Sequence, residues 1–422
     1  MEKLYALVDC NNFFVSCERV FRPDLEDKPV LVLSSNDGCV VSRSNEVKDM
    51  GIKMAAPYYE IRDLAKSRGV KIFSNNFAIY GAISNRIMAL LGTFTPEIEV
   101  YSIDEAFLDL GGVPTEKIEQ YARNIAKVVK QQTGVPVSIG IASTKTLAKV
   151  ASKIAKKHPE LQGAKYLPDG LVDQALSEIE VQDIWGIGWK LGASMRNAGV
   201  FTASHLKKLD PAFVGKKYSV AVERTVLELN GTQCIAIGEG LTTKKNLVRS
   251  RSFGTRITEL CDVENAVSTF ISQGACDLRK RNSLAWMVAV FIRTDKHRMD
   301  KPQYSNFFSV SLPYATNDTI MLNKAALFAL RKIFKKGLIY KKAGIMLLNI
   351  VPKSASQLAF DQDLEKTEEQ KTLMETLDRV NNKYGHKTLH LASEGFDPKW
   401  TSRSNLRSPN YLTSWHEIPI VK

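Results

Sequence analysis

Residues 98–110 read IEVYSIDEAFLDL, two strand-forming runs joined by a polar turn. The first run alternates apolar residues with charged or polar ones, and the second, residues 106–110, is apolar except for Asp109. Alternation followed by a second apolar run is typical of a β-hairpin. We therefore expect a hairpin whose apex carries Asp104 and Glu105.

The segments on either side of this hairpin predict a complete sheet. We expect a buried strand at residues 4–8, amphipathic helices at 79–91 and 118–129, and a last strand at 137–142. The order strand, helix, strand, strand, helix, strand is the ferredoxin-like arrangement. Residues 20–75 interrupt this order after the first strand, and we expect them to form a small inserted subdomain.

This strand order predicts where three carboxylates meet. In the ferredoxin-like sheet the first and third strands are antiparallel neighbours, so the end of the first lies beside the start of the third. Asp9 follows the first strand, and Asp104 and Glu105 precede the third. Like charges packed together are normally neutralised by a cation, and oxygen ligands favour Mg²⁺. The alternative is a turn carboxylate at Asp9 and an ordinary polar hairpin apex.

Positive charge is concentrated in one third of the chain. The 422 residues carry a formal net charge of +13, and residues 241–350 hold 19 Lys and Arg against 7 Asp and Glu. A folded segment with so basic a surface is typical of nucleic-acid binding, and the alternative is a solvated surface that aids solubility.

The composition excludes several classes of protein. A hydrophobic content of 44% is ordinary for a globular chain, and the length predicts two to four domains. An apolar run of the ~18 residues needed to cross a membrane is lacking, so we expect no membrane contact. Six cysteines without a CxxC pair fit free thiols in a reducing cytoplasm better than disulfides or a zinc ribbon.

Four motifs in this chain point to one family. They are Asp9-Cys10-Asn11-Asn12-Phe13-Phe14, Tyr101-Ser102-Ile103-Asp104-Glu105-Ala106, Lys145-Thr146-Leu147-Ala148-Lys149 and Trp185-Gly186-Ile187-Gly188. Together they resemble the signatures of the Y-family translesion DNA polymerases, of the bacterial UmuC and MucB type that forms the catalytic subunit of DNA polymerase V. The likeness extends to the closing residues 418–420.

The resemblance implies a multidomain α+β fold. The implied parts are a ferredoxin-like palm (1–19 and 76–165) with inserted fingers (20–75), a helical thumb with a helix-hairpin-helix (166–240), an α+β little finger (241–350), and a partly flexible linker and C-terminal interaction region (351–422).

The resemblance also implies the catalytic residues. Asp9 and Asp104 would hold two Mg²⁺ ions, Glu105 would lie beside the primer 3′-OH, and the backbone carbonyl of Cys10 would be the remaining protein ligand. Such a pair of ions serves in-line phosphoryl transfer.

A second set of residues would bind the incoming dNTP. Phe14 falls at the steric gate, an aromatic ring that leaves no room for a 2′-hydroxyl, and Phe13 beside it is a further candidate for substrate binding, with the protein core as its alternative place. Asn45, Lys48 and Lys156 match residues that touch the triphosphate, although the family often has Tyr and Arg at the first two positions.

Residues 143–157 predict a helix with a basic face. Ser143 is the expected N-cap, and apolar residues form a buried stripe. The rest of the surface holds Lys145, Lys149, Lys153 and Lys156. Such a face suits phosphate, although a single surface lysine more often lies in solvent.

Residues 183–199 predict a helix-hairpin-helix. Its glycines would let backbone N–H groups approach a phosphate, and as a lone motif it equally fits an ordinary turn. The DNA-binding residues implied by the family are Gly186, Ile187, Gly188 and Lys190 in the thumb, and Arg249, Arg251, Lys341 and Lys342 in the little finger.

The tail predicts a linker at residues 353–371. Within it, Gln357, Leu358 and Phe360 resemble the peptide by which bacterial polymerases bind the sliding clamp, one residue shorter than usual, and short motifs of this kind also match by chance. By resemblance, the partners are primer-template DNA, a processed UmuD-like dimer, RecA and the clamp.

The sequence therefore predicts an error-prone translesion DNA polymerase of the SOS response, cytoplasmic and associated with the nucleoid when on DNA. One alternative is a nucleotidyl cyclase on a related palm, but such an enzyme would not need the hairpin glycines or the basic segment at residues 241–350. The other alternative is a non-catalytic DNA-binding subunit, but such a protein would not need the carboxylates of Asp9, Asp104 and Glu105.

Overall fold

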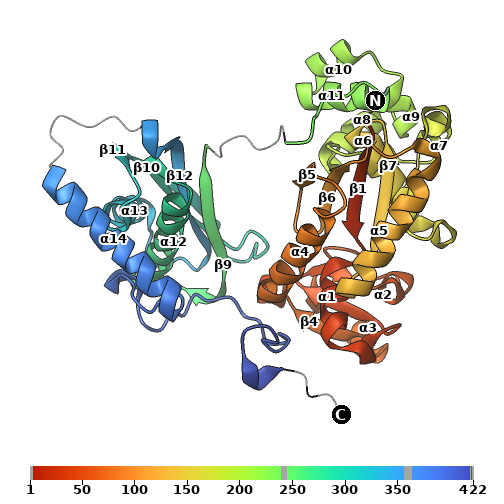
Figure 1. Ribbon diagram of the computed structural model, residues 1–422. Helices are drawn as coiled ribbons and strands as arrows, with labels where there is room; N and C mark the ends of the chain where they lie inside the picture. The colour runs from red at the N-terminus through yellow and green to blue at the C-terminus, as the bar shows by residue number, and fades with distance from the viewer. Residues whose placement is uncertain (1–2, 239–244, 356–363, 419, 421–422) are drawn as a thin grey trace. The chain divides into compact units, whose positions relative to one another are not determined.

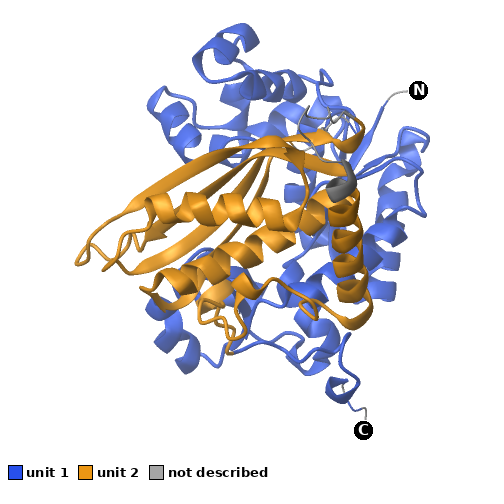
Figure 2. Ribbon diagram, turned by 90° about the vertical axis from the view of Figure 1, so that its left-hand side faces the viewer, with its two compact units in different colours: residues 1–34, 38–242, 406–422 blue, residues 35–37, 243–405 orange. Residues whose placement is uncertain are grey.

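A computed structural model describes residues 3–238, 245–355, 364–418 and 420. The chain divides into two compact units, shown in two colours in Figure 2. Unit 1 comprises residues 1–34, 38–242 and 406–422, and unit 2 comprises residues 35–37 and 243–405.

Unit 1 is built on a five-stranded sheet of order β5-β6-β1-β7-β8 (Figure 1). Its strands are β1 (Tyr5–Cys10), β5 (Ile98–Val100), β6 (Glu105–Asp109), β7 (Val137–Ala142) and β8 (Ala164–Tyr166). The first four follow the predicted ferredoxin-like order, with β1 antiparallel to both β6 and β7. The prediction of the fold class is confirmed, and β8 adds a strand parallel to β7.

Alternate residues of β1 pack on opposite faces of the sheet. Ala6 and Val8 join a core with the helices α1 (Phe13–Phe21), α4 (Phe77–Leu91) and α5 (Ile118–Thr133). Tyr5 and Leu7 join a second core with the helix α6 (Lys145–Lys157). The end of β1 therefore lies between two packed layers, which fixes its direction.

The hairpin differs from the prediction by one residue. β6 begins at Glu105, so this residue is part of the strand and does not lie at the apex. Ser102 holds the turn, because its hydroxyl accepts hydrogen bonds from the backbone N–H groups of Asp104 (3.2 Å) and Glu105 (3.0 Å). Because one serine side chain satisfies the two backbone N–H groups of the turn, the turn is tight and the strand can begin at Glu105.

The inserted subdomain is a second, smaller sheet. Its strands have the order β3-β2-β4, with β2 (Val30–Leu33), β3 (Val40–Arg43) and β4 (Lys71–Ser74). The helices α2 (Asn45–Asp49) and α3 (Tyr58–Ser67) belong to the same subdomain and contribute to its small core. β4 is an edge strand of this sheet.

Five short helices follow the palm sheet. They are α7 (Val172–Ser177), α8 (Trp189–Asn197), α9 (Ala203–Lys207), α10 (Pro211–Lys217) and α11 (Val220–Leu229). Their apolar residues continue the core formed by α6 and one face of the palm sheet. Gly186 has φ +86, a left-handed conformation that favours glycine, in the loop that leads into α8.

Unit 2 contains a four-stranded antiparallel sheet of order β11-β10-β12-β9. The strands are β9 (Leu247–Ile257), β10 (Ser283–Thr294), β11 (Ser305–Thr316) and β12 (Tyr340–Pro352). The helices α12 (Leu260–Lys280) and α13 (Thr319–Ile333) cover one face of this sheet (Figure 2).

The tail contains a helix where the sequence predicts a linker. α14 (Leu364–Tyr384) begins within the expected linker at 353–371. Asp378 of α14 accepts two hydrogen bonds from the guanidinium of Arg279 (2.6 and 2.8 Å), which fastens this helix to α12. Within the described ranges, no helix has both the length and the apolar character needed to cross a membrane.

Candidate active site

The strand register brings the three predicted carboxylate residues together. Asp9 in β1 pairs directly with Glu105 in β6. The N–H of Cys10 donates to the carbonyl of Asp104 at 2.9 Å. Residues 95 positions apart in the chain thus share one edge of the palm sheet, as the strand order predicts.

Burial shapes the electrostatics of this edge. Burial raises the pKa of Asp9 to about 6, the charge of Lys156 opposes this rise, and the charges of Glu105 and Asp104 add to it. Burial also raises the pKa of the Cys10 thiol, so this group stays neutral. A neutral thiol is a poor ligand for a hard cation, and Cys10 is left with its carbonyl oxygen as a donor.

Lysines of α6 neutralise the carboxylates. Lys156 forms an ion pair with Asp9, and Lys149 Nζ lies 3.0 Å from both carboxylate oxygens of Glu105. Asp104 accepts a 2.5 Å hydrogen bond from the hydroxyl of Ser102. These two ion pairs lie in the wall of a cavity of about 260 Å³, which is also lined by Lys153.

The donor set of this edge fits a hard divalent cation. It offers carboxylate and backbone carbonyl oxygens, the ligands that Mg²⁺ prefers. In the described part of the chain, no three His, Cys, Asp or Glu side chains are arranged to hold a metal ion together. The carboxylates are turned to their lysine and serine partners instead, so a cation would take the place of Lys156 at Asp9.

Two details of α6 differ from the prediction. Lys145 is buried, with its Nζ 2.8 Å from Glu99 and 2.9 Å from the carbonyl of Ala236, so it is not part of the basic surface. Thr144 is the N-cap in place of Ser143, because its hydroxyl accepts the N–H of Leu147. The lysine face therefore begins at Lys149.

The predicted gate residue lies at the start of α1. The ring of Phe14 is half-buried and stacks on the ring of Tyr80, with centroids 4.5 Å apart and an interplanar angle of 15°. Phe77 contacts the same ring edge-on at 5.7 Å. Phe13, the other aromatic candidate for substrate binding, is buried in the palm core, which leaves its side chain little surface for a substrate.

The predicted triphosphate residues adjoin the same site. Asn45 Oδ1 accepts hydrogen bonds from Asn12 (3.2 Å) and from Lys48 Nζ (2.9 Å). Partial burial lowers the pKa of Lys48, and the nearby charges of Arg43 and Lys156 lower it further. The structure thus gathers several cations near the carboxylate edge.

Arg43 is a candidate that sequence reasoning missed. It ends β3, and its guanidinium donates to the carbonyl of Ile52. Its charge acts on Lys48, which places it among the cations of this site. Its position two residues before Asn45 is the signal that could have found it.

The predicted DNA contacts in the thumb are partly accessible. Gly188 is the N-cap of α8, and Lys190 lies in its first turn. Ile187 is buried in the thumb core, so only its backbone could reach a phosphate.

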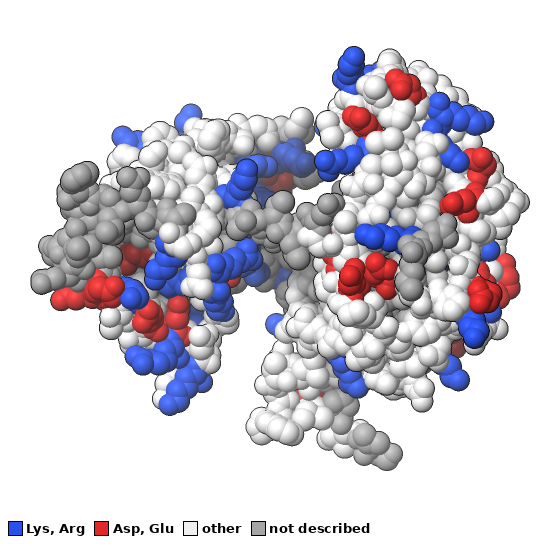
Figure 3. All heavy atoms as spheres, turned by 45° about the horizontal axis from the view of Figure 1, so that its top comes forward, with Lys and Arg blue, Asp and Glu red and all other residues white. Residues whose placement is uncertain are grey.

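The four predicted DNA contacts in unit 2 do not share one face. Arg249 pairs with Asp277 of α12, and Arg249 and Arg251 both line a cavity beside α12 and α14. Lys342 alternates with the buried Ala343 of β12, which directs it to the opposite face of the sheet. Groups of Lys and Arg lie over unit 2, on the left in Figure 3.

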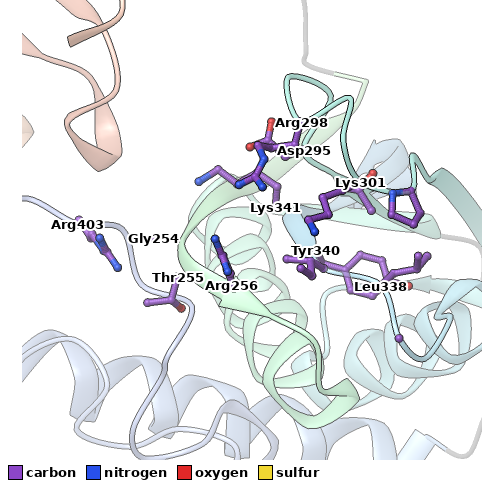
Figure 4. A pocket seen from close by; sticks show the side chains of 14 residues that line it. Gly254, Thr255, Arg256, Asp295, Arg298, Lys301, Leu338, Tyr340, Lys341 and Arg403 are labelled. Atoms are coloured by element: carbon purple, nitrogen blue, oxygen red, sulfur yellow. The ribbon is translucent and has the colours of Figure 1, made fainter. Parts of the chain in front are cut away.

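Lys341 belongs to a third place, a basic cavity of about 620 Å³ in unit 2 (Figure 4). Its Nζ donates to the carbonyl of Phe253 at 3.0 Å. The cations that line this cavity with it are Arg256, Arg298, Lys301 and Arg403. The predicted clamp-binding residues Gln357, Leu358 and Phe360 lie outside the described residues.

Comparison with known proteins identifies related families. The impB/mucB/samB family model matches residues 8–153, and the model of that family's C-terminal domain matches residues 244–360. A domain of unknown function, DUF4113, matches residues 371–421.

Curated relatives match over nearly the full length. The chain is 37% identical to Protein ImpB of Salmonella typhimurium and 37% identical to Protein UmuC of the same species, over 99% of this chain and 100% of each relative. It is 31% identical to DNA polymerase IV of Corynebacterium diphtheriae, over 61% of this chain and 59% of that protein.

Solved structures show the same fold. A Y-family DNA polymerase chimera aligns with a TM-score of 0.67 at 22% identity, covering 83% of this chain and 99% of the other. An insertion ternary complex of Dbh DNA polymerase aligns with a TM-score of 0.56 over the same fractions, also at 22% identity.

Proposed function

Because the chain belongs to the impB/mucB/samB family, the UmuC and MucB type of Y-family translesion DNA polymerases, we propose that Asp9, Asp104 and Glu105 form its catalytic centre. The protein is a DNA-directed DNA polymerase of the SOS response. The observation that carries the proposal is the pairing of Asp9 with Glu105, with Cys10 hydrogen-bonded to Asp104 beside them.

Two Mg²⁺ ions are the proposed cofactors. Asp9, Asp104 and the carbonyl of Cys10 would hold them, and Glu105 would face the primer 3′-OH. When bound, the ions supply Lewis acidity at the reacting phosphate. Burial is the main cause of the raised pKa of Asp9, and the charges of Glu105 and Asp104 add to it. A bound cation would stabilise the ionised form of this carboxylate, which supports the assignment.

The cations around this edge would receive the triphosphate of the incoming dNTP. Lys156 contacts Asp9, and the charges of Arg43 and Lys156 both lie near enough to Lys48 to lower its pKa. A compact group of lysine and arginine side chains offsets the charge of a triphosphate and holds it for in-line attack.

Phe14 would select the sugar. Its ring is backed by Tyr80 and Phe77, so it could not move aside for a 2′-hydroxyl without disturbing both contacts. Close packing behind a ring makes it an effective steric barrier.

The domain roles follow the same proposal. Residues 1–19 and 76–165 would act as palm, 20–75 as fingers, 166–240 as thumb and 241–350 as little finger. The net positive charge of residues 241–350 supports contact with the DNA backbone.

The cell biology of the protein is part of the proposal too. It would copy damaged templates with low fidelity in the cytoplasm, together with a processed UmuD-like dimer, RecA and the sliding clamp. The near full-length match to Protein UmuC supports these partners.

Primer extension tests the proposed site. Asp104→Asn should lower the extension rate at least ~100-fold, because charge stabilisation in the transition state is lost, while duplex binding is retained. Asp109→Asn, at the far end of β6, the strand that begins one residue after Asp104, is the matched control and should extend normally.

Unchanged extension by Asp104→Asn would show that the catalytic centre is elsewhere. Failure of the wild-type protein to extend a primer, with duplex binding intact, would favour a non-catalytic DNA-binding subunit.

A further inference from the structure

The tail returns to the inserted subdomain and pairs with the end of its edge strand through a single β-bridge. Ser74, the last residue of the edge strand β4, forms a parallel bridge with Arg407. The N–H of Ser74 donates to the carbonyl of Leu406 at 2.9 Å, and the N–H of Leu406 donates to the hydroxyl of Ser74 at 2.9 Å. Backbone pairing at an edge strand is a specific way to dock a chain segment.

The next tail residue, Ser408, enters a buried polar network. Its hydroxyl donates to Glu18 Oε1 at 3.1 Å, and the hydroxyl of Tyr80 donates to the same oxygen at 2.7 Å. The side-chain amide of Asn76 donates to the Ser408 hydroxyl at 3.1 Å. The relative exposures of Ser408, Glu18, Asn76 and Tyr80 are 5%, 0%, 1% and 0%.

Two further contacts fasten the same segment. The guanidinium of Arg407 donates to Asn76 Oδ1 at 3.0 Å. Tyr411 stacks on Phe21 of α1, with ring centroids 4.7 Å apart and an interplanar angle of 15°. Residues 406–411, which we call the strap, therefore touch β4, α1 and the N-cap residue of α4, Asn76.

Two residues, Glu18 and Tyr80, connect the strap to the proposed gate. Glu18 has two hydroxyl donors on one oxygen, and its other oxygen lacks a hydrogen-bond partner in the described part of the chain. A buried carboxylate with so few donors depends strongly on each of them. Glu18 in turn accepts the hydrogen bond of the Tyr80 hydroxyl and so fixes its position, and the ring of Tyr80 stacks on the ring of Phe14.

We propose that the strap positions Tyr80 beneath Phe14 and thereby sharpens the discrimination between deoxyribonucleotides and ribonucleotides. Ser408 and Glu18 are positioning residues, since they act through Tyr80. The inference rests on the proposed role of Phe14 as the sugar gate. It assigns a task within the polymerase to the segment at 371–421 that matches DUF4113.

The test is the ratio of kcat/KM for a dNTP to that for the matching rNTP. Ser408→Ala should lower this ratio about fivefold, the effect expected from one buried hydrogen bond. Because the ratio compares two substrates on the same enzyme, a partly unfolded preparation does not change it.

Tyr80→Phe removes the hydroxyl and keeps the ring, and it should lower the ratio to a similar extent. The double variant Ser408→Ala/Tyr80→Phe should lose less than the sum of the two single effects, since both act through Glu18. Thr413→Ala, an exposed hydroxyl of the tail, is the control and should leave the ratio unchanged.

Phe14→Ala separates the two levels of the proposal. If Phe14→Ala admits ribonucleotides but Ser408→Ala and Tyr80→Phe keep the wild-type ratio, the strap has no part in selection and only the gate stands. If Phe14→Ala itself keeps the wild-type ratio, the gate assignment is wrong and the inference falls with it. Equal losses of kcat/KM for both nucleotides in Ser408→Ala would also overturn it.

Discussion

Asp9, which is half-buried, and Glu18, which is fully buried, are two carboxylates of unit 1 that are held in different ways. Asp9 lies at a strand end, pairs with Lys156 and has two other carboxylates beside it. Glu18 lies within α1 and receives hydrogen bonds from the neutral hydroxyls of Tyr80 and Ser408. Burial raises the pKa of both groups.

The difference teaches what each site can do. A carboxylate paired with a flexible lysine can exchange that partner for a metal ion. A buried carboxylate that accepts hydrogen bonds from the hydroxyls of two other chain segments can only hold those segments to its own helix. We therefore assign Asp9 to chemistry and Glu18 to architecture.

The largest expected effect is on the extension rate, and it tests the difference between the two carboxylates directly. Asp9→Asn should lower the single-turnover extension rate by on the order of 1000-fold, because the charge that holds the cation is lost. Glu18→Gln keeps an oxygen acceptor and should extend with dNTPs at close to the wild-type rate. Equal losses in the two variants would remove the distinction.

The next effect concerns the gate. Phe14→Ala should raise kcat/KM for ribonucleotides about 100-fold, since the steric barrier to a 2′-hydroxyl is removed. Steady-state incorporation of matched dNTP and rNTP pairs measures it. An unchanged preference would place sugar selection on another residue.

The pH dependence of stability sharpens the comparison. The folded pKa of Asp9 is raised from 3.8 to about 6, so its stabilising contribution is full below pH 3.8 and is lost as pH rises through about 6. The free energy of unfolding of wild type should therefore fall by about 3 kcal/mol more than that of Asp9→Asn over this range without divalent cations. Urea denaturation at a series of pH values measures it.

Added Mg²⁺ should change the contribution of Asp9 to the pH dependence of stability and leave that of Glu18 unchanged. It binds the ionised form of Asp9 and should offset that group's loss of stability at higher pH. Because the pKa of Glu18 is also raised, its contribution to the free energy of unfolding falls as pH rises too. Mg²⁺ should not offset this second loss. Parallel pH profiles for wild type and Asp9→Asn would contradict this account.

The smallest effect concerns the triphosphate. Lys48→Ala should raise the KM for dNTP about tenfold with little change in kcat, the expected cost of one charged phosphate contact. Lys53→Ala, an exposed lysine of the same subdomain, is the control. A loss confined to kcat would mean that Lys48 acts on the reaction and not on binding.

The sequence was sufficient to predict the palm because its signals are local. Alternation around residues 98–110 predicts the hairpin, and the order of elements then predicts that Asp9 pairs with Glu105, as observed. Strand order converts local periodicity into a contact between distant residues.

The rest depends on tertiary contacts that leave no local pattern. Lys145 looks like a surface lysine, yet it is buried because Glu99 and the carbonyl of Ala236 lie opposite it, 46 and 91 residues away. Ser408 meets Glu18 across 390 residues. A polar residue whose partners are so remote cannot be told from a solvated one by periodicity or composition.

The central claim is that Asp9 and Asp104 share divalent cations. The most direct measurement is anomalous diffraction from crystals grown with Mn²⁺, primer-template DNA and a non-hydrolysable dNTP. We predict Mn²⁺ between Asp9, Asp104 and the carbonyl of Cys10, with Lys156 turned from Asp9 to the triphosphate. Lys156 still paired with Asp9, and no anomalous density at that carboxylate, would contradict the account.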